Sequence, residues 1–124
     1  MKTIIIFSIC ITVTLYCSNA IKSISKHDQG SVITVALGTD LLIELEANPS
    51  TGFDWETVHI DSSKILFKNI SFIASDSLPG SGGMEYFIFK TVQKGESLLK
   101  LAYLRPWEGR GSMIDSFSVF IKVQ

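Results

Sequence analysis

The sequence predicts an all-β sandwich of about seven strands, on three observations. Short runs alternate apolar and polar residues with a period of two, which is the pattern of half-buried strands. Turn-forming Gly, Pro, Asn and Asp residues separate these runs at close intervals. No long window repeats apolar residues at positions i, i+3, i+4 and i+7, so the pattern does not indicate an amphipathic helix.

Turn residues bound each expected strand. Gly38-Thr39-Asp40 ends the first strand, and Asp61-Ser62-Ser63 ends the third. Lys68-Asn69 marks an irregularity within the fourth. Gln93-Lys94-Gly95-Glu96 is a tight turn, so the fifth and sixth strands are expected to pair as a hairpin. The expected strands span residues 31–37, 41–46, 53–59, 65–74, 84–92, 97–104 and 114–123.

The apolar face of each strand predicts the core of the sandwich. Trp55 alternates with Asp54 and Glu56, so we expect its side chain to be buried. We find no internal repeat and no domain boundary except near residue 20. The expected core residues are Leu41, Ile43, Leu45, Trp55, Phe67, Phe87, Phe89, Leu99, Leu101, Phe117, Val119 and Ile121.

The first twenty residues have the pattern of a secretory signal peptide. Lys2 precedes an apolar run, and Ser18-Asn19-Ala20 places small residues where signal peptidase reads the chain. We therefore expect cleavage after Ala20 and a mature domain of residues 21–124, secreted or held in lysosomes or other vesicles, with no stable membrane association. An uncleaved membrane anchor is the alternative, although the apolar run is shorter than the roughly 20 residues of a spanning helix.

Composition excludes several classes of function for this mature domain. Both cysteines, Cys10 and Cys17, lie in the expected signal peptide, which leaves no catalytic thiol, zinc–cysteine site or disulfide. Without Lys2, ten basic and twelve acidic residues give a net charge of −2 with no basic stripe, so nucleic acid is not an expected partner. His27 and His59 stand alone, and no Gly-x-Ser-x-Gly elbow or carboxylate pair with an adjacent His is present. We expect no enzyme, no metal ion and no cofactor.

Three segments rich in Gly and Pro lie between the expected strands. Each of them joins an even-numbered strand to the odd-numbered strand that follows. In a Greek-key sandwich alternate connections leave at the same end, so these distant loops should share one end of the domain, where binding function usually lies. The segments are Asn48-Pro49-Ser50-Thr51-Gly52-Phe53, Gly80-Ser81-Gly82-Gly83-Met84 and Arg105-Pro106-Trp107-Glu108-Gly109.

The first segment has the residues of a loop that is partly ordered before binding. Pro49 restricts its own φ and pushes Asn48 toward extended geometry, which orders the loop before binding. Thr51 is small and carries both a donor and an acceptor, and Gly52 permits a positive φ. An ordinary turn is the alternative for this segment taken alone.

The other two segments favour different kinds of contact. Residues 80–83 offer an exposed backbone with little side chain that can hydrogen-bond to a partner, and a flexible linker is the alternative. Trp107 lies between Pro106 and Glu108, so we expect it to be exposed and to dominate the binding energy, rather than to be a core residue. Arg105 is expected either to pair with a carboxylate or to support the loop.

Together, in this order and at this spacing, the three motifs resemble the loops of the chagasin-type inhibitors of cysteine proteases, with Phe87 downstream of the second motif. Ser50 stands where that family often has a second threonine. The resemblance implies an immunoglobulin-like fold and reversible, tight inhibition of papain-like (clan CA) cysteine proteases. It implies that loop 48–52 enters the active-site cleft near the catalytic cysteine and histidine, flanked by loops 80–83 and 105–109.

The resemblance thus implies a monomer that binds one protease molecule and occludes its cleft without covalent chemistry. An immunoglobulin-like adhesion or recognition module with another protein partner is the alternative, and it predicts no protease inhibition that depends on Thr51 or Trp107. A small hydrolase is a second alternative, which turnover of a substrate would reveal.

One further motif is separate from the three loops. Asn69-Ile70-Ser71 is an N-glycosylation sequon, which would carry sugar if the chain passes through a glycosylating compartment. A chance tripeptide is the alternative. Asn48-Pro49-Ser50 is not a sequon, because proline occupies its middle position.

Overall fold

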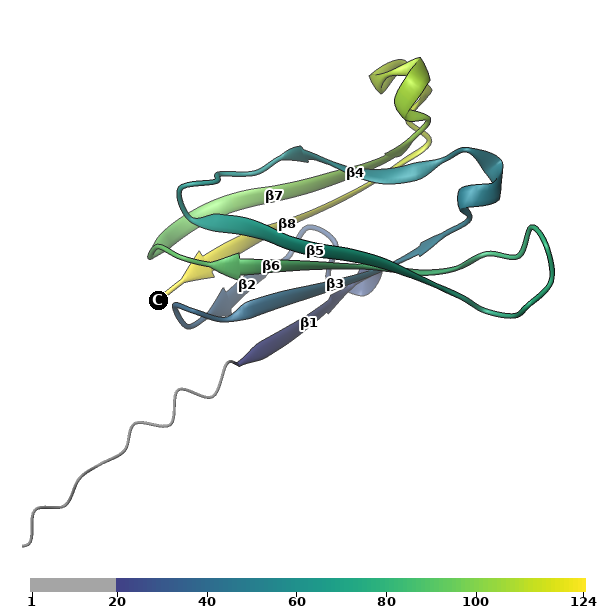
Figure 1. Ribbon diagram of the computed structural model, residues 1–124. Helices are drawn as coiled ribbons and strands as arrows, with labels where there is room; N and C mark the ends of the chain where they lie inside the picture. The colour runs from purple at the N-terminus through teal and green to yellow at the C-terminus, as the bar shows by residue number, and fades with distance from the viewer. Residues whose placement is uncertain (1–19) are drawn as a thin grey trace, which may run out of the picture.

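A computed structural model describes residues 20–124 as two four-stranded β-sheets packed face to face, as Figure 1 shows. The expected signal peptide falls outside the described residues except for Ala20. One sheet has the order β1-β3-β6-β5 and the other β2-β8-β7-β4, which confirms the all-β, immunoglobulin-like sandwich. The strands are β1 (Ile21–Ser25), β2 (Val32–Val35), β3 (Asp40–Ala47), β4 (Asp54–His59), β5 (Ile65–Ala74), β6 (Gly83–Thr91), β7 (Gly95–Leu104) and β8 (Asp115–Val123).

One strand was not expected from the sequence. β1 pairs in parallel with β3 and places Ile24 in the core with no exposed surface. Ile24 is the only buried residue of this strand. A single inward side chain is too short a pattern to indicate a strand in the sequence. The position of β1 depends instead on its pairing with β3.

The expected hairpin between the fifth and sixth strands is wrong. Those strands correspond to β6 and β7, and they belong to different sheets. Phe87 and Phe89 of β6 and Leu99 and Leu101 of β7 are all buried in the core between the sheets. The turn signal marked a reversal of the chain, but it did not distinguish pairing within a sheet from stacking across the sandwich.

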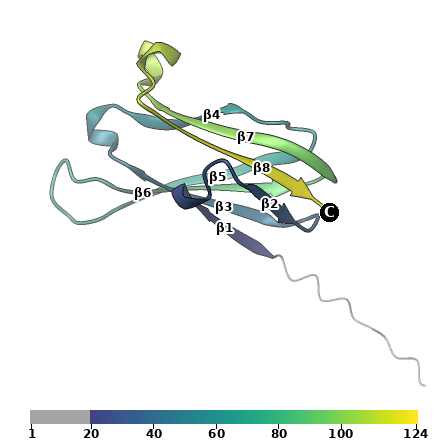
Figure 2. The ribbon, with the colours of Figure 1, turned by 180° about the vertical axis from the view of Figure 1, so that it is seen from behind.

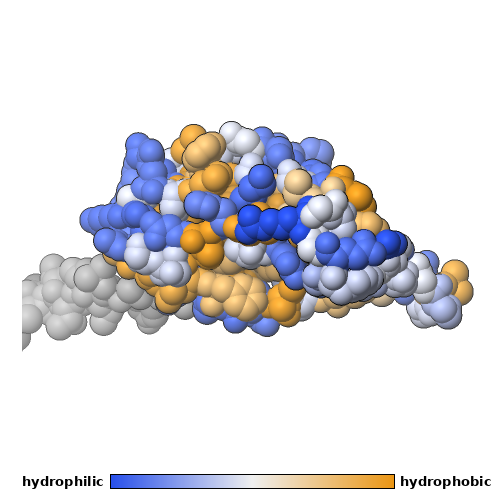
Figure 3. Space-filling model, turned by 90° about the horizontal axis from the view of Figure 1, so that it is seen from above, coloured by the Kyte–Doolittle hydropathy of each residue, from blue (hydrophilic) through white to orange (hydrophobic). Residues whose placement is uncertain are grey.

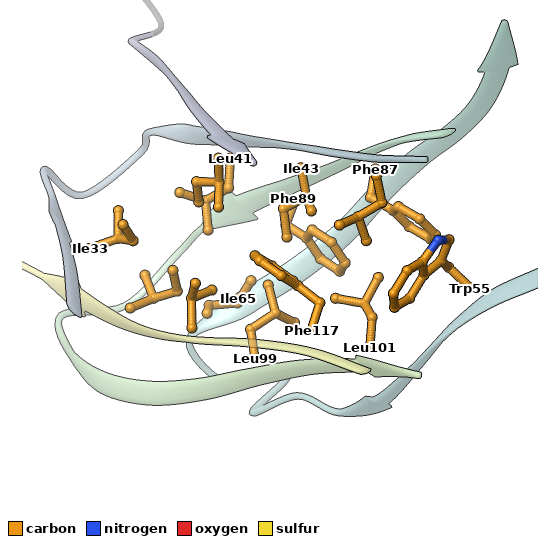
Figure 4. Close-up of a cluster of buried hydrophobic side chains, with 14 of the residues drawn as sticks. Ile33, Leu41, Ile43, Trp55, Ile65, Phe87, Phe89, Leu99, Leu101 and Phe117 are labelled. Atoms are coloured by element: carbon orange, nitrogen blue, oxygen red, sulfur yellow. The ribbon is translucent and has the colours of Figure 1, made fainter. Parts of the chain in front are cut away.

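Eleven of the twelve expected core residues are buried, and Figure 4 shows many of them filling the space between the sheets. Burying each such side chain contributes about 1.5–3 kcal/mol to folding. Phe67 is the exception, because it is 53% exposed. β5 is an edge strand, so the Phe67 ring packs against Phe89 at 5.7 Å between centroids while its other side faces solvent.

The irregularity expected near Lys68 and Asn69 is confirmed, since the register of β5 against β6 shifts between Phe67 and Asn69. Regular helix in residues 20–124 is limited to four 3₁₀ turns of three residues each. None of the described helices is long and apolar enough to cross a membrane.

The three Gly- and Pro-rich loops lie at the same end of the sandwich. Figures 1 and 2 show the β3–β4, β5–β6 and β7–β8 connections together at one end, opposite the C-terminus. The turns β2–β3, β4–β5 and β6–β7 lie at the other end. The counting argument from strand order is therefore confirmed. We call these connections the middle loop (48–53), the glycine loop (75–83) and the tryptophan loop (105–114).

Candidate functional site

The middle loop is a single turn of 3₁₀ helix, η2 (Pro49–Thr51), held by its own side chains. Asn48 has φ −134° and ψ 88°, close to the extended geometry expected before proline. Its Oδ1 accepts hydrogen bonds from the backbone N–H of Ser50 at 3.2 Å and from the Ser50 hydroxyl at 2.5 Å. The loop is therefore ordered in the free protein.

Thr51 and Gly52 complete this turn. The Thr51 hydroxyl donates to the carbonyl oxygen of Asn48 at 2.7 Å and accepts from the N–H of Phe53 at 3.3 Å. The donor and acceptor of Thr51 thus serve the loop itself, while its exposed side chain remains at the tip. Gly52 has φ +82°, the left-handed value for which glycine was expected.

The tryptophan loop contacts the middle loop directly. Trp107 lies in η3 (Pro106–Glu108) and is 70% exposed, as expected. A Cβ atom added to Gly52 would overlap Cη2 of Trp107 and lie 3.0 Å from Cζ2, so the indole rests on the Gly52 backbone. Two features therefore favour glycine at position 52: the positive φ of its backbone and the Trp107 ring that covers it.

Arg105 supports both of these loops. Its guanidinium lies over the Phe53 ring, 4.5 Å from the centroid, and Nη1 is 3.5 Å from the Glu108 carboxylate. The structure therefore shows both roles that the sequence left open, the ion pair and the support of the loop. A cation over an aromatic ring at such a site contributes on the order of 0.5–2 kcal/mol.

The glycine loop meets the middle loop on the opposite side. The Gly80 carbonyl accepts from Asn48 Nδ2 at 3.1 Å, and the Ser50 hydroxyl oxygen lies 3.4 Å from it. Residues 75–80 are exposed, and the loop closes where the N–H of Ser75 donates to the Gly82 carbonyl at 3.0 Å.

Gly83 departs from the expected exposed backbone. It is the first residue of β6 and is buried, paired with Ala47 on one side and Ala74 on the other. A Cβ atom there would overlap the carbonyl oxygen of Ile73. The small size of Gly83 therefore serves the close packing of three strands.

A hollow of about 540 Å³ lies between the middle loop and the glycine loop. Asn48, Gly82 and the half-buried Met84 contribute to its lining, and Tyr103 lies among them. The hollow thus joins the first and second expected segments, while the third segment contacts the middle loop through Trp107 on Gly52.

Tyr103 is a residue of the loop end that the sequence analysis did not single out. Its hydroxyl accepts a hydrogen bond from the N–H of Asn48 at 2.9 Å. Its ring stacks on Trp55 with centroids 5.0 Å apart and contacts Phe53 at 5.7 Å. Its place in the sequence, two residues before Arg105, was the available signal, but the hydrogen bond spans 55 positions and no local pattern encodes it.

Comparison with known proteins identifies the family of this domain. Residues 34–121 match the model of the chagasin family of peptidase inhibitors, I42. The chain belongs to the chagasin family. Chagasin of Trypanosoma cruzi is 32% identical over 104 residues, which cover 80% of this chain and 94% of chagasin. Members of the chagasin family are inhibitors and not enzymes.

Solved structures of the same fold support this assignment. The cysteine protease inhibitor EhICP2 of Entamoeba histolytica has a TM-score of 0.75 at 21% identity, covering 85% of this chain and 96% of that one. PbICP-C, solved in complex with falcipain-2, has a TM-score of 0.56 at 18% identity, covering 86% and 93%. These likenesses are evidence for the chagasin fold.

Beneath the loops of this chagasin-family domain lies a carboxyl pair that the sequence did not indicate. Glu85 of β6 is only 3% exposed. Burial raises the pKa of Glu85 to about 8, and a side-chain hydrogen bond with Asp54 and the charge of Asp54 act in the same direction. Glu85 therefore holds a proton at neutral pH, next to the first residue of β4.

Within residues 20–124, no three His, Cys, Asp or Glu side chains lie close enough to hold a metal ion. His27 and His59 are both exposed.

Proposed function

We propose that this chain inhibits papain-like cysteine proteases reversibly and tightly, with its three loops placed in and around the active-site cleft. One observation carries the proposal: in a chagasin-family domain, three distant segments are fixed to one another at one end of the sandwich. Trp107 lies on Gly52 and Asn48 bonds to the Gly80 carbonyl. The relatives described as cysteine protease inhibitors, and the complex with falcipain-2, support the class of target.

The middle loop is the segment proposed to enter the cleft. Its tip, Pro49–Thr51, is exposed and narrow, and its polar groups are already paired within the loop. A loop fixed in this way loses little conformational entropy on association, which favours tight binding. No nucleophile of the inhibitor takes part, so the protease should recover when the complex dissociates.

The flanking loops are proposed to widen the contact. Trp107 presents a large exposed ring of the kind that often dominates interface energy. On the other side, the half-buried residues Ser81, Gly82 and Met84 line the hollow. Together they form a surface on both sides of the middle loop, which fits a one-to-one complex of a monomeric inhibitor.

A titration tests this proposal. Purified residues 21–124 are added to papain and to a cathepsin L-type protease while cleavage of a fluorogenic peptide is followed. We expect loss of activity at one inhibitor per active site and recovery on dilution. A folded protein that leaves both proteases active at micromolar concentration would contradict the proposal. Activity that does not return on dilution would contradict the reversible mechanism.

We also propose that the domain enters the secretory pathway after removal of residues 1–20. The motif Ser18-Asn19-Ala20 supports this, and so does the start of β1 at Ile21, directly after the expected cleavage site. N-terminal sequencing of the chain secreted from eukaryotic cells should begin at Ile21. Retention in the cell membrane with Lys2 still present would contradict the proposal.

A further inference from the structure

β5 presents an unusual edge to solvent. It is the last strand of its sheet and pairs only with β6. Every residue of β5 after Ile65 is exposed. Figure 3 shows apolar surface among the hydrophilic side chains on one face of the molecule. The exposed large apolar side chains of β5 are Leu66 (46%), Phe67 (53%), Ile70 (44%), Phe72 (39%) and Ile73 (61%).

A long apolar edge of this kind favours pairing with another chain, and proteins usually cover or interrupt such an edge. Part of the interruption is present already. The register shift between Phe67 and Asn69 breaks the regular ladder, and Lys68 places a charge there, 3.5 Å from Asp40. Five large apolar side chains nevertheless remain uncovered on this strand.

The sequon Asn69-Ile70-Ser71 lies at this interruption. Asn69 is exposed, and its Oδ1 accepts a hydrogen bond from the N–H of Ile70 at 2.8 Å. Among residues 20–124, Nδ2 of Asn69 has no hydrogen-bond partner. Ser71 is two residues further along the strand, so its hydroxyl lies on the same face of the sheet as the Asn69 amide. The acceptor nitrogen is therefore open to solvent in the folded protein.

We propose that Asn69 carries an N-linked oligosaccharide that covers the outer apolar surface of the β5 edge, formed by Leu66 and Ile73. An N-glycosidic bond forms between Nδ2 of Asn69 and the anomeric carbon of the first sugar. The bond between that carbon and the pyrophosphate of a lipid-linked oligosaccharide breaks, and the proton lost by the amide leaves with the lipid pyrophosphate. The modification rests on the proposed secretory route.

The position of Asn69 separates this site from the inhibitory surface. Asn69 pairs with Ile88 in the middle of β6, whereas the glycine loop begins beyond Ala74 at the end of β5. A glycan on Asn69 would leave from the outer face of β5, the face of Leu66 and Ile73, and away from the glycine loop. We expect modified and unmodified protein to inhibit the protease equally.

The test uses the full chain with its own leader, secreted from eukaryotic cells. The intact mass of the protein from the medium is measured before and after peptide N-glycosidase F, with Ser71→Ala and Ser71→Thr as matched variants. We expect one glycan on the natural chain and on Ser71→Thr, and none on Ser71→Ala. A chain that is retained in the cells, or secreted without sugar on Asn69, would overturn the proposal.

Sedimentation velocity over a range of concentrations tests the covering role. We expect the glycosylated protein to stay monomeric, and Ser71→Ala to self-associate at the same concentrations. Equal behaviour of the two would overturn the covering role, and an unmodified natural dimer would assign the edge to a second copy of the chain. Inhibition is assayed separately, so loss of inhibition in every form would contradict the proposed function and leave the glycan result unchanged.

Discussion

The two tryptophans of this domain show how one residue type serves two purposes. Trp55 is 4% exposed, donates from Nε1 to the Glu46 carbonyl at 2.9 Å and stacks on Tyr103. Trp107 is 70% exposed and rests on Gly52. Trp55 supports the loop end from beneath, whereas Trp107 offers its ring to a partner. The difference follows from the backbone, an alternating strand in one case and a Pro–Gly loop in the other.

Replacement of Trp55 should have the largest effect, and that effect should be on stability. Trp55→Ala removes a buried ring, a hydrogen bond and the stacking on Tyr103, so the free energy of unfolding should fall by about 3–5 kcal/mol. Urea denaturation measures the change. Trp55→Phe, which keeps a ring, is the matched control and should lose less. A Trp55→Ala variant as stable as the natural domain would contradict the supporting role.

Replacement of Trp107 should instead weaken inhibition. Truncating an exposed interface tryptophan removes about 2–4 kcal/mol of binding energy, so the inhibition constant should rise by about one to three powers of ten. The urea midpoint should change little, because the ring is mostly exposed. An unchanged inhibition constant would exclude Trp107 from the interface.

Gly52→Ala tests whether the contact between the middle and tryptophan loops matters. The added methyl group would collide with the Trp107 ring at a residue with φ +82°. Gly38→Ala is the matched control, because Gly38 has φ +87° with open space around it and lies at the opposite end. Both variants should lose about 1–2 kcal/mol of stability. Only Gly52→Ala should also weaken inhibition, and equal inhibition by both variants would show that the contact is dispensable.

Tyr103→Phe removes only the hydroxyl that accepts from Asn48. The middle loop then loses one anchor while the aromatic stack remains, so inhibition should weaken by about 0.5–1.5 kcal/mol. Tyr86→Phe is the matched control, because it also removes one tyrosine hydroxyl. Tyr86 lies in β6 between Glu44 of β3 and Ser71 of β5, so its replacement leaves the loop end untouched. Inhibition constants that are the same for both variants would exclude Tyr103 as a positioning residue.

Glu85→Gln should change inhibition least and alter the pH dependence of stability. The pKa of Glu85 is raised from 4.5 to about 8, so the folded state binds an extra proton between these values. Its contribution to stability is therefore complete below about pH 4.5 and is lost as the pH rises through 8. The melting temperature of the natural domain should fall over this window, and Glu85→Gln should reduce the slope. An identical slope would contradict the protonated pair.

The sequence predicted the features that short patterns encode. Alternation placed Trp55 in the core, and Pro and Gly placed Trp107 in an exposed loop. Strand order alone predicted that three distant loops share one end. The first two properties depend on neighbouring residues in the chain. The third depends on the order of the strands, because alternate connections leave at the same end of the sandwich. Both can be read from the sequence.

Features that depend on contacts between distant segments were not predictable. The bond from Asn48 to Tyr103, the proton on Glu85 and the pairing of β1 with β3 each require two segments far apart in the sequence. Phe67 was expected to be buried because it lies in the long apolar run of residues 65–74, which the sequence indicated as a strand. Its exposure follows from the place of β5 at the sheet edge.

Hydrogen–deuterium exchange of residues 21–124, alone and bound to papain, tests the central claim most directly. The account predicts new protection in the middle, glycine and tryptophan loops together, with no change in the turns at the opposite end or along β5. Protection at the opposite end, or in one loop without the other two, would contradict a binding surface built jointly from three loops.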